Sequence, residues 1–137
     1  MAKVRGGKIK KHRKHILVID DEPSWRQMLS IILDKRGYDV KAAESGAEAL
    51  KTIAQFKPDL IFSDIRMPDM NGFDFFDNLK KLPKTSSTPV VFFSAIDDYD
   101  AKKVARDLGA ADFIVKPFDE DELGSILSRL LPTKSAS

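Results

Sequence analysis

Three carboxylates, a hydroxyl and an ammonium stand at the ends of four short apolar runs in this chain of 137 residues. They belong to Asp20, Asp21, Asp64, Ser94 and Lys116. The runs cover residues 16–19, 60–63, 90–93 and 113–115. Runs of this length, rich in β-branched and aromatic residues, are typical of buried strands in a parallel sheet. Because parallel strands end at the same edge, where open α/β sheets bind ligands, we expect these side chains to share one pocket.

The side chains of this pocket favour a magnesium site and phosphoryl chemistry. Two carboxylates about 4 Å apart repel each other by roughly 4 kcal/mol at an effective dielectric near 20, so a cluster of three is costly without a cation. Oxygen ligands without His or Cys favour Mg²⁺ over zinc. One carboxylate then acts as a nucleophile towards a phosphoryl group, while Lys116 neutralises the transferred oxygens and Ser94 donates a hydrogen bond. The pattern predicts phosphorylation of an aspartate.

Each of these residues also has a simpler structural explanation when it is taken alone. Asp20, Asp21 and Asp64 can be turn formers or can stabilise the first turn of a helix. Ser94 can satisfy backbone groups at a strand end, and Lys116 can be a solvated lysine before a turn. None of these explanations accounts for polar residues at four equivalent strand ends, so only the joint pattern is specific.

Patterns of strand and helix alternate five times along the chain. This alternation predicts an α/β fold with a parallel sheet, right-handed crossovers and helices on both faces. Pro23 suits the first turn of a helix that ends before Gly37, and residues 38–43 form a short second strand. The spacing of Ser45 and Glu48 is typical of a capping box at the start of the next helix.

The remaining helices are marked by their apolar stripes and their ends. The fourth helix stops at Gly109, and Asp119 and Glu122 can cap the last one. Each of the five predicted helices has a group of apolar residues. In chain order, helix by helix, these are Met28, Leu29, Ile32 and Leu33; Ala49, Leu50, Ile53 and Ala54; Phe73, Phe76 and Leu79; Val104, Ala105 and Leu108; and Leu123, Ile126, Leu127, Leu130 and Leu131.

The formal net charge of +2 is distributed unevenly. Residues 1–15 hold seven Lys or Arg, two His and no acid, whereas the rest of the chain carries 16 Lys and Arg against 21 Asp and Glu, a net charge of −5. A block of like charge with few apolar residues should stay disordered. The plain interpretation is a solvated arm. The alternative is an electrostatic anchor, through residues 3–14, for nucleic acid or another polyanion.

Composition also limits the class of protein. The chain has no cysteine, so disulfides and thiolate metal sites are excluded. No apolar stretch approaches the roughly 20 residues of a membrane-spanning helix. No apolar segment or cleavage site of a secretory signal follows the basic N-terminus, so we expect one cytoplasmic domain. Because only the tail 132–137 follows the last predicted helix, we expect output through binding to a separate protein.

Four motifs resemble those of the receiver domains of two-component response regulators. They are VIDDE at 18–22, DIRMPDMNG at 64–72, FSA at 93–95 and KPF at 116–118. The resemblance covers nearly all of the chain outside a basic arm of residues 1–14. It implies a receiver domain over residues 15–131, with a doubly wound (βα)5 sheet in the flavodoxin-like strand order 2-1-3-4-5. It implies phosphorelay signal transduction rather than an enzyme, with Mg²⁺-dependent self-phosphorylation and autodephosphorylation only.

The resemblance gives roles to the acidic residues. Asp64 corresponds to the phosphoacceptor and Asp21 to a direct Mg²⁺ ligand, while Asp20 binds the metal through water. The backbone carbonyl of Arg66 completes the protein ligands. Positions 66 and 96 tune dephosphorylation in this family, and neither Arg66 nor Ile96 offers a carboxamide or carboxylate to orient water. This predicts slow decay of the phosphorylated form.

Further implied roles concern catalysis, switching and partners. Lys116 and Ser94 contact the phosphoryl group, and Phe113 stands where the family has an aromatic ring whose rotation reports phosphorylation. A cis Lys116–Pro117 bond is also implied. The switching surface comprises the fourth helix, the fifth strand and the fifth helix. The implied partners are a sensor histidine kinase or phosphotransfer protein, a downstream protein target and, after phosphorylation, a second copy of the chain.

Other protein classes fit the sequence less well. A haloacid-dehalogenase-like phosphatase has a second Asp two residues after its nucleophile, where this chain has Arg66. A flavodoxin-like flavin carrier needs a hydroxyl-rich phosphate loop after the first strand, where this chain has Asp20, Asp21 and Glu22. The alternative that stays open is a pseudo-receiver, or an excised receiver fragment, that acts as an interaction module. A pseudo-receiver usually lacks an acid or the lysine, and this chain lacks neither.

Overall fold

The computed structural model describes residues 13–95 and 99–132, which form five strands and five helices in alternation. The strands are β2 (His15–Ile19), β3 (Asp39–Ala43), β4 (Leu60–Asp64), β5 (Val90–Ala95) and β6 (Asp112–Lys116). The helices are α2 (Pro23–Lys35), α3 (Gly46–Ile53), α4 (Gly72–Lys80), α5 (Tyr99–Leu108) and α6 (Glu120–Leu130). The predictions made for the basic arm up to residue 12, for Ile96 and for the tail from residue 133 lie outside the described residues.

The strands pair in the order β3-β2-β4-β5-β6, and every pair is parallel. Counted along the chain this is the order 2-1-3-4-5, so the predicted fold class is confirmed. Every residue of the central strand β4 is buried, whereas the edge strands β3 and β6 include exposed residues. The continuous apolar run that ends at Asp64 follows from this position, because a central parallel strand has helices on both faces.

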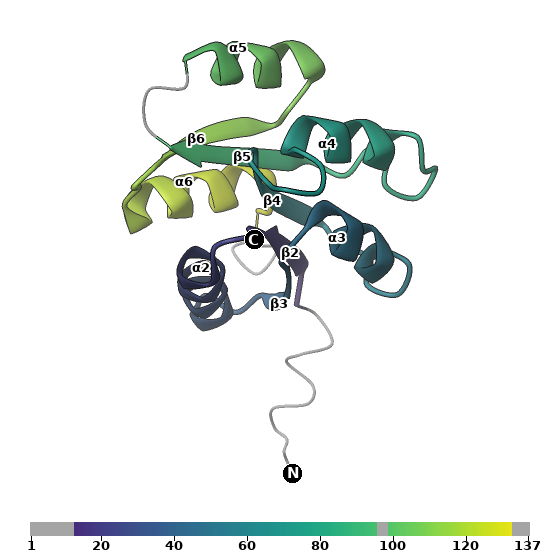
Figure 1. The fold of residues 1–137 in the computed structure, drawn as a ribbon. Helices are drawn as coiled ribbons and strands as arrows, with labels where there is room; N and C mark the ends of the chain where they lie inside the picture. The colour runs from purple at the N-terminus through teal and green to yellow at the C-terminus, as the bar shows by residue number, and fades with distance from the viewer. Residues whose placement is uncertain (1–12, 96–98, 133–137) are drawn as a thin grey trace.

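Helices cover the sheet on both sides (Figure 1). Side chains alternate along β2: Ile16 and Val18 pack with α2 and α6, whereas Leu17 and Ile19 pack with α3, α4 and α5. The core is therefore divided by the sheet into two layers, as the predicted right-handed crossovers require. Within the described residues, no helix is both long and apolar enough to cross a lipid bilayer.

The predicted helix starts are observed, with one difference in detail. The Ser45 hydroxyl accepts a hydrogen bond from the backbone N–H of Glu48, and Asp119 caps α6 by accepting one from the N–H of Glu122. In a full capping box the Glu48 carboxylate would return a bond to Ser45. Instead it accepts the N–H of Glu44, one residue earlier. The predicted helix start is confirmed, and the second bond of the capping box goes to the N–H of Glu44 instead of that of Ser45.

Helix α2 begins at Pro23 and is followed by Gly37, which has a φ of 97°. This is the left-handed conformation that favours glycine after a helix end. Leu29 and Leu33 are buried, but Met28 is 39% exposed, so the prediction that Met28 faces inward was wrong. The side of α2 that reaches the sheet is narrower than the predicted stripe, and Met28 lies on its flank.

Helix α5 touches the sheet through small side chains. Ala101 and Ala105 are buried, whereas Val104 and Leu108 are about two-fifths exposed. The helix exists where these residues predicted it, and Gly109, with a φ of 99°, follows its end. The two larger apolar side chains flank the contact because the alanines bring the helix close to the strands beneath it.

Candidate functional site

The predicted acidic cluster forms at the carboxyl ends of β2 and β4. These strands are neighbours, and Ile19 and Ser63 are partners in their register. Asp20 and Asp64 are the next residues on the two strands, which explains why they meet. One carboxylate oxygen from each of Asp20, Asp21 and Asp64 lies within 4.8 Å of the others. Asp20 and Asp64 are buried, whereas Asp21 is exposed.

Lys116 reaches this cluster from the end of β6, on the other side of β5. Its Nζ lies 2.9 Å from Oδ2 of Asp20, 3.6 Å from Oε1 of Glu22 and 3.8 Å from Oδ2 of Asp64. Only 8% of Lys116 is exposed, so its charge is largely removed from water and depends on these partners. Sequence reasoning did not include Glu22 in the site; its position next to the acidic pair was the available signal.

Asp20 has all of its acceptors engaged by the protein. Oδ1 accepts the N–H of Glu22 at 2.9 Å, Oδ2 accepts Nζ of Lys116, and the backbone carbonyl accepts Nη1 of Arg26 at 2.8 Å. Each carboxylate oxygen of Asp20 therefore already has one donor from the protein. Binding of a metal by Asp20 through water stays a prediction.

The carboxyl group of Asp64 lies in an unfavourable place for a charge. Burial, followed by the negative charge of Asp20, raises its pKa from 3.8 to about 7. The positive charge of Lys116 and a 2.9 Å hydrogen bond from the N–H of Ile65 to Oδ1 lower the pKa in part. Without a cation beyond Lys116, this carboxyl group takes up a proton near neutral pH.

The donor set fits a divalent cation that prefers oxygen. Three carboxylates converge, one of them is exposed at the surface, and one has a raised pKa because the local charge is not balanced. A divalent cation would remove this imbalance, and oxygen ligands select Mg²⁺ rather than zinc. The backbone carbonyl of Arg66 stays a predicted ligand.

Ser94 is the most informative residue of the site. It is 1% exposed, and among the described residues its Oγ finds no hydrogen-bond partner. It lines a cavity of about 520 Å³ together with Asp21, Asp64 and Lys116. A buried hydroxyl without a partner costs about 1–3 kcal/mol, so Ser94 is well placed to donate to an acceptor oxygen that enters this cavity.

The loop between β4 and α4 is held by hydrogen bonds within it and to the start of α3. The N–H of Gly72 donates to the carbonyl of Ile65 at 2.7 Å, and Asp69 accepts the N–H of Ala47 at 2.9 Å. A Cβ at Gly72 would lie 2.5 Å from the backbone oxygen of Asp64. Glycine is therefore required here for α4 to start close to the end of β4.

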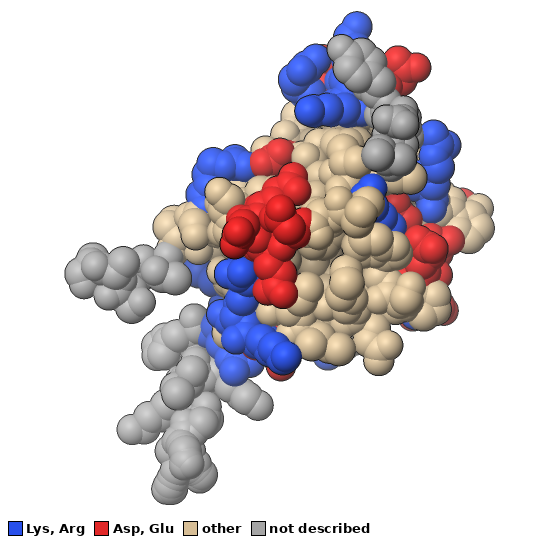
Figure 2. Space-filling model, turned by 90° about the vertical axis from the view of Figure 1, so that its left-hand side faces the viewer, with Lys and Arg blue, Asp and Glu red and all other residues tan. Residues whose placement is uncertain are grey.

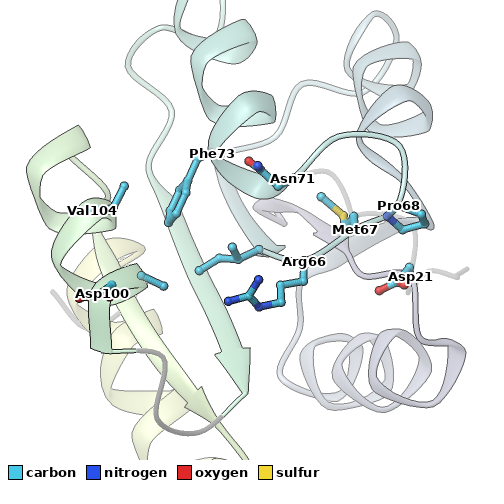
Figure 3. Close-up of a pocket in the computed structure, with 10 residues that line it drawn as sticks. Asp21, Arg66, Met67, Pro68, Asn71, Phe73, Asp100 and Val104 are labelled. Carbon is cyan, nitrogen blue, oxygen red and sulfur yellow. The ribbon is translucent and has the colours of Figure 1, made fainter.

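A second cavity, of about 610 Å³, adjoins the first and shares Asp21 and Arg66 with it. Figure 3 shows the Arg66 side chain extending from the β4–α4 loop into this cavity, with Phe73 beside it and Asp100 and Val104 across from it on α5. Sequence reasoning placed the Arg66 backbone in the site but did not connect its side chain with α5. Loop paths of this kind have no sequence period to reveal them.

Phe113 and the segment after β6 complete the set of predicted residues. Phe113 pairs with Phe92 in the register of β5 and β6, is half-buried, and packs against the layer formed by α3, α4 and α5. The Lys116–Pro117 bond is cis, as predicted. All predicted site residues in the described segments therefore lie at the carboxyl edge, except Phe113, which lies farther back on its strand.

Comparison with known proteins gives a consistent result. Residues 16–128 match the family model described as the response regulator receiver domain. Protein PilH of Pseudomonas aeruginosa is 35% identical over 116 residues, which are 85% of this chain and 96% of PilH. The regulatory protein AtoC of Escherichia coli is 36% identical over 120 residues, or 88% of this chain, but this match spans only 26% of AtoC.

Solved structures show the same similarity in three dimensions. The chemotaxis response regulator CheY4 of Vibrio cholerae superimposes with a TM-score of 0.80 at 34% identity, over 87% of this chain and 99% of that one. A structure described as a putative response regulator from Chloroflexus aurantiacus gives a TM-score of 0.83 at 30% identity, over 88% and 99% of the two chains.

Proposed function

The chain belongs to the family of response regulator receiver domains, and from this premise we propose that it accepts a phosphoryl group on Asp64 from a sensor histidine kinase or a phosphotransfer protein. We propose a cytoplasmic location, where such donors present their phosphohistidine. The buried hydroxyl of Ser94, which lines the same cavity as Asp64, carries this proposal, because among the described residues it has no acceptor and a phosphoryl oxygen on Asp64 would supply one.

The proposed reaction is an in-line displacement at phosphorus. An Oδ of Asp64 attacks, a P–O bond to the carboxylate forms, and the P–N bond to the donor histidine breaks. The electron pair leaves with the imidazole, which takes up a proton. Asp64 must be ionised to attack, and its pKa of about 7 in the metal-free fold makes a bound cation favourable at neutral pH.

The other residues would stabilise the charge on the transferred group. Lys116, with Nζ 3.8 Å from Asp64, is placed to donate to a phosphoryl oxygen. Ser94 would donate its hydroxyl to a second one. Asp20, Asp21, Asp64 and the carbonyl of Arg66 would hold Mg²⁺, which when bound supplies positive charge to the phosphoryl oxygens. We propose that the site is a phosphoacceptor whose only reactions are self-phosphorylation and autodephosphorylation.

Switching is proposed to pass from Ser94 to Phe113. Movement of Ser94 towards the phosphoryl group would open space beneath it, and Phe113, on the neighbouring strand and only half-buried, would turn into that space. The output surface would then be α5, β6 and α6. It presents charged side chains of both signs, including the ion pair between Asp112 and Arg129.

Acidic and basic side chains also gather on the face of the molecule formed by α2 and α6. Figure 2 shows acidic side chains gathered next to basic ones on the side of the molecule where α2 and α6 lie in Figure 1. Glu120, Asp121 and Glu122 form the first turn of α6, and Nη2 of Arg36 lies 3.9 Å from Oε1 of Glu120. We propose that proteins are the partners of the folded part, and that any affinity for polyanions belongs to residues 3–14.

Intact-mass analysis after incubation with acetyl phosphate and Mg²⁺ tests the proposal. We expect one added phosphoryl group, labile in alkali and to hydroxylamine, that disappears in Asp64→Asn and is strongly reduced in Lys116→Ala. Asp77→Asn is the matched control, because Asp77 is an exposed aspartate on α4, paired with Lys81. Unchanged labelling of Asp64→Asn would refute the assignment. Absence of labelling in the wild type would favour the pseudo-receiver alternative.

A further inference from the structure

The ammonium of Lys116 lies against two aromatic rings as well as against carboxylates. Its Nζ is 4.9 Å from the centroid of the Trp25 ring and 5.0 Å from that of Phe93. Both distances are within the range in which a ring face attracts a cation. The proposed reaction gives these rings no part, although Trp25 lines the same cavity as Asp64.

Trp25 is held in this place from two sides. Its ring centroid lies 5.7 Å from that of Phe118, with an angle of 39° between the planes. Phe118 lies two residues after Lys116, so this contact joins α2 to the segment that carries the lysine. The next residue of α2, Arg26, donates to the backbone carbonyl of Asp20 at 2.8 Å. The first turn of α2 is thus fixed to both parts of the pocket.

Lys116 has several carboxylates within reach. Its Nζ lies closest to Asp20, at 2.9 Å, and farther from Glu22, at 3.6 Å, and from Asp64, at 3.8 Å. Its long, flexible stem has no intrinsic preference among these positions, and a direct contact with Asp64 would cover an oxygen that has to attack phosphorus. The Trp25 ring, whose centroid lies 4.9 Å from Nζ, is placed to limit these positions.

We propose that Trp25 is a positioning residue for Lys116: its ring holds the ammonium beside Asp20, with an N–H left for the phosphoryl oxygens on Asp64. This inference rests on the proposed function. The effect depends on the π face of the ring and not on its volume, since an aliphatic side chain attracts no cation. Phe93 adds a second ring face but is also part of the core, so Trp25 is the residue to vary.

Two substitutions separate the ring face from the volume. Trp25→Phe keeps an aromatic face, and Trp25→Leu keeps an apolar side chain without one. Phe76→Leu is the matched control, because Nζ of Lys80 lies 5.0 Å from the centroid of Phe76 in a similar contact on α4. Phe76 does not line the cavity that holds Asp64. Melting curves of all variants identify a temperature at which every variant is folded, and the measurements are made at that temperature.

The first measurement is the initial rate of phosphorylation of the full chain at saturating Mg²⁺ and acetyl phosphate. Trp25→Leu should slow this rate by about 3–10-fold, the range expected for loss of a partly desolvated cation–π contact. Trp25→Phe should stay within about twofold of the wild type, and Phe76→Leu should match it. Equal losses in the Leu and Phe variants at position 25, or no loss in either, would overturn the inference.

A double-mutant cycle tests whether the ring acts through Lys116. In a Lys116→Met background, where we expect slow residual phosphorylation by the small donor, Trp25→Leu should have no further effect, because the cation is already absent. A loss by the same factor in both backgrounds would mean that Trp25 acts on the pocket by another route. That result would also overturn the inference.

The second measurement needs no phosphate. The ε-methylene protons of Lys116 should resonate upfield in the wild type and in Trp25→Phe, because they lie over a ring, and should move downfield in Trp25→Leu. Absence of the upfield position in the wild type refutes the inference even where Asp64 is phosphorylated normally. The wild type could show the upfield resonance of Lys116 and yet take up no phosphate. In that case the proposed function fails, and the proposed role of Trp25 in phosphoryl transfer fails with it.

Discussion

Asp64→Asn should stabilise the metal-free protein above neutral pH. Burial, then the charge of Asp20, raises the pKa of Asp64 to about 7, and Lys116 opposes this only in part. The folded protein therefore binds this proton more tightly than the unfolded chain does. For this group the free energy of unfolding falls as pH rises between about 4 and 7, and stays low above that window. Asn carries no charge and removes the penalty.

The size of the effect follows from the difference between the two pKa values. A pKa of about 7 instead of 3.8 corresponds to a ceiling of about 4 kcal/mol above pH 7. Because the cavity opens to solvent, which screens the charge, we expect about 1–2 kcal/mol, or roughly 3–10 °C in melting temperature. Asp21→Asn should raise the melting temperature less, since Asp21 is exposed and contributes least to the raised pKa of Asp64.

Thermal unfolding followed by circular dichroism, in chelator at pH 8 and pH 5, measures this effect. Asp64→Asn should melt higher than the wild type at pH 8, and its advantage should shrink at pH 5, where the wild-type carboxyl is largely protonated. Millimolar Mg²⁺ should raise the melting temperature of the wild type more than that of Asp64→Asn, through binding linkage. If Asp64→Asn does not melt higher than the wild type at pH 8, this account of the pocket is refuted. It is also refuted if the difference in melting temperature is as large at pH 5 as at pH 8.

Three further predictions concern the loop between β4 and α4. Gly72→Ala should destabilise the fold by about 2 kcal/mol and slow phosphorylation, because its methyl group would lie 2.5 Å from the backbone oxygen of Asp64; urea unfolding and the labelling rate check this. Arg66→Asn should speed the loss of phosphate from the phosphorylated protein, measured as decay of the added mass, because a carboxamide can orient the attacking water. Asp69→Ala should cost about 1 kcal/mol in the free energy of unfolding, because the N–H of Ala47 at the start of α3 loses its acceptor. An Asp69→Asn control, which keeps an acceptor oxygen, should lose less, and equal losses would contradict the capping role.

The pocket was predictable because it follows from a rule about strand ends. Asp20, Asp64, Ser94 and Lys116 each end an apolar run, and parallel strands bring such ends to one edge whatever the strand order. Their convergence therefore needed no knowledge of side-chain conformation. The helix starts at Ser45 and Asp119 were predictable for a similar reason, since the capping bonds are local.

The parts that sequence reasoning missed depend on side-chain directions and loop paths. Whether Glu22 turns towards Lys116 is a choice of rotamer, and the sequence does not show it. The exposure of Met28 depends on how closely α2 approaches the sheet. The cavity between Arg66 and α5 depends on the path of a loop with no regular period. Each of these is set by packing between elements that are distant in the chain.

Among the described residues the buried hydroxyl of Ser94 has no hydrogen-bond partner, so this side chain contributes little to the stability of the resting fold. Ser94→Ala should therefore cost the unphosphorylated form little stability, because no hydrogen bond between described residues is lost. In the proposed mechanism the same change would remove the hydrogen bond that Ser94 donates to the phosphoryl group. Stability of the resting state and strength of the signal are thus separable at one atom. A selection for stability that uses only the unphosphorylated protein would therefore tolerate Ser94→Ala. The selected domain would fold well and switch poorly.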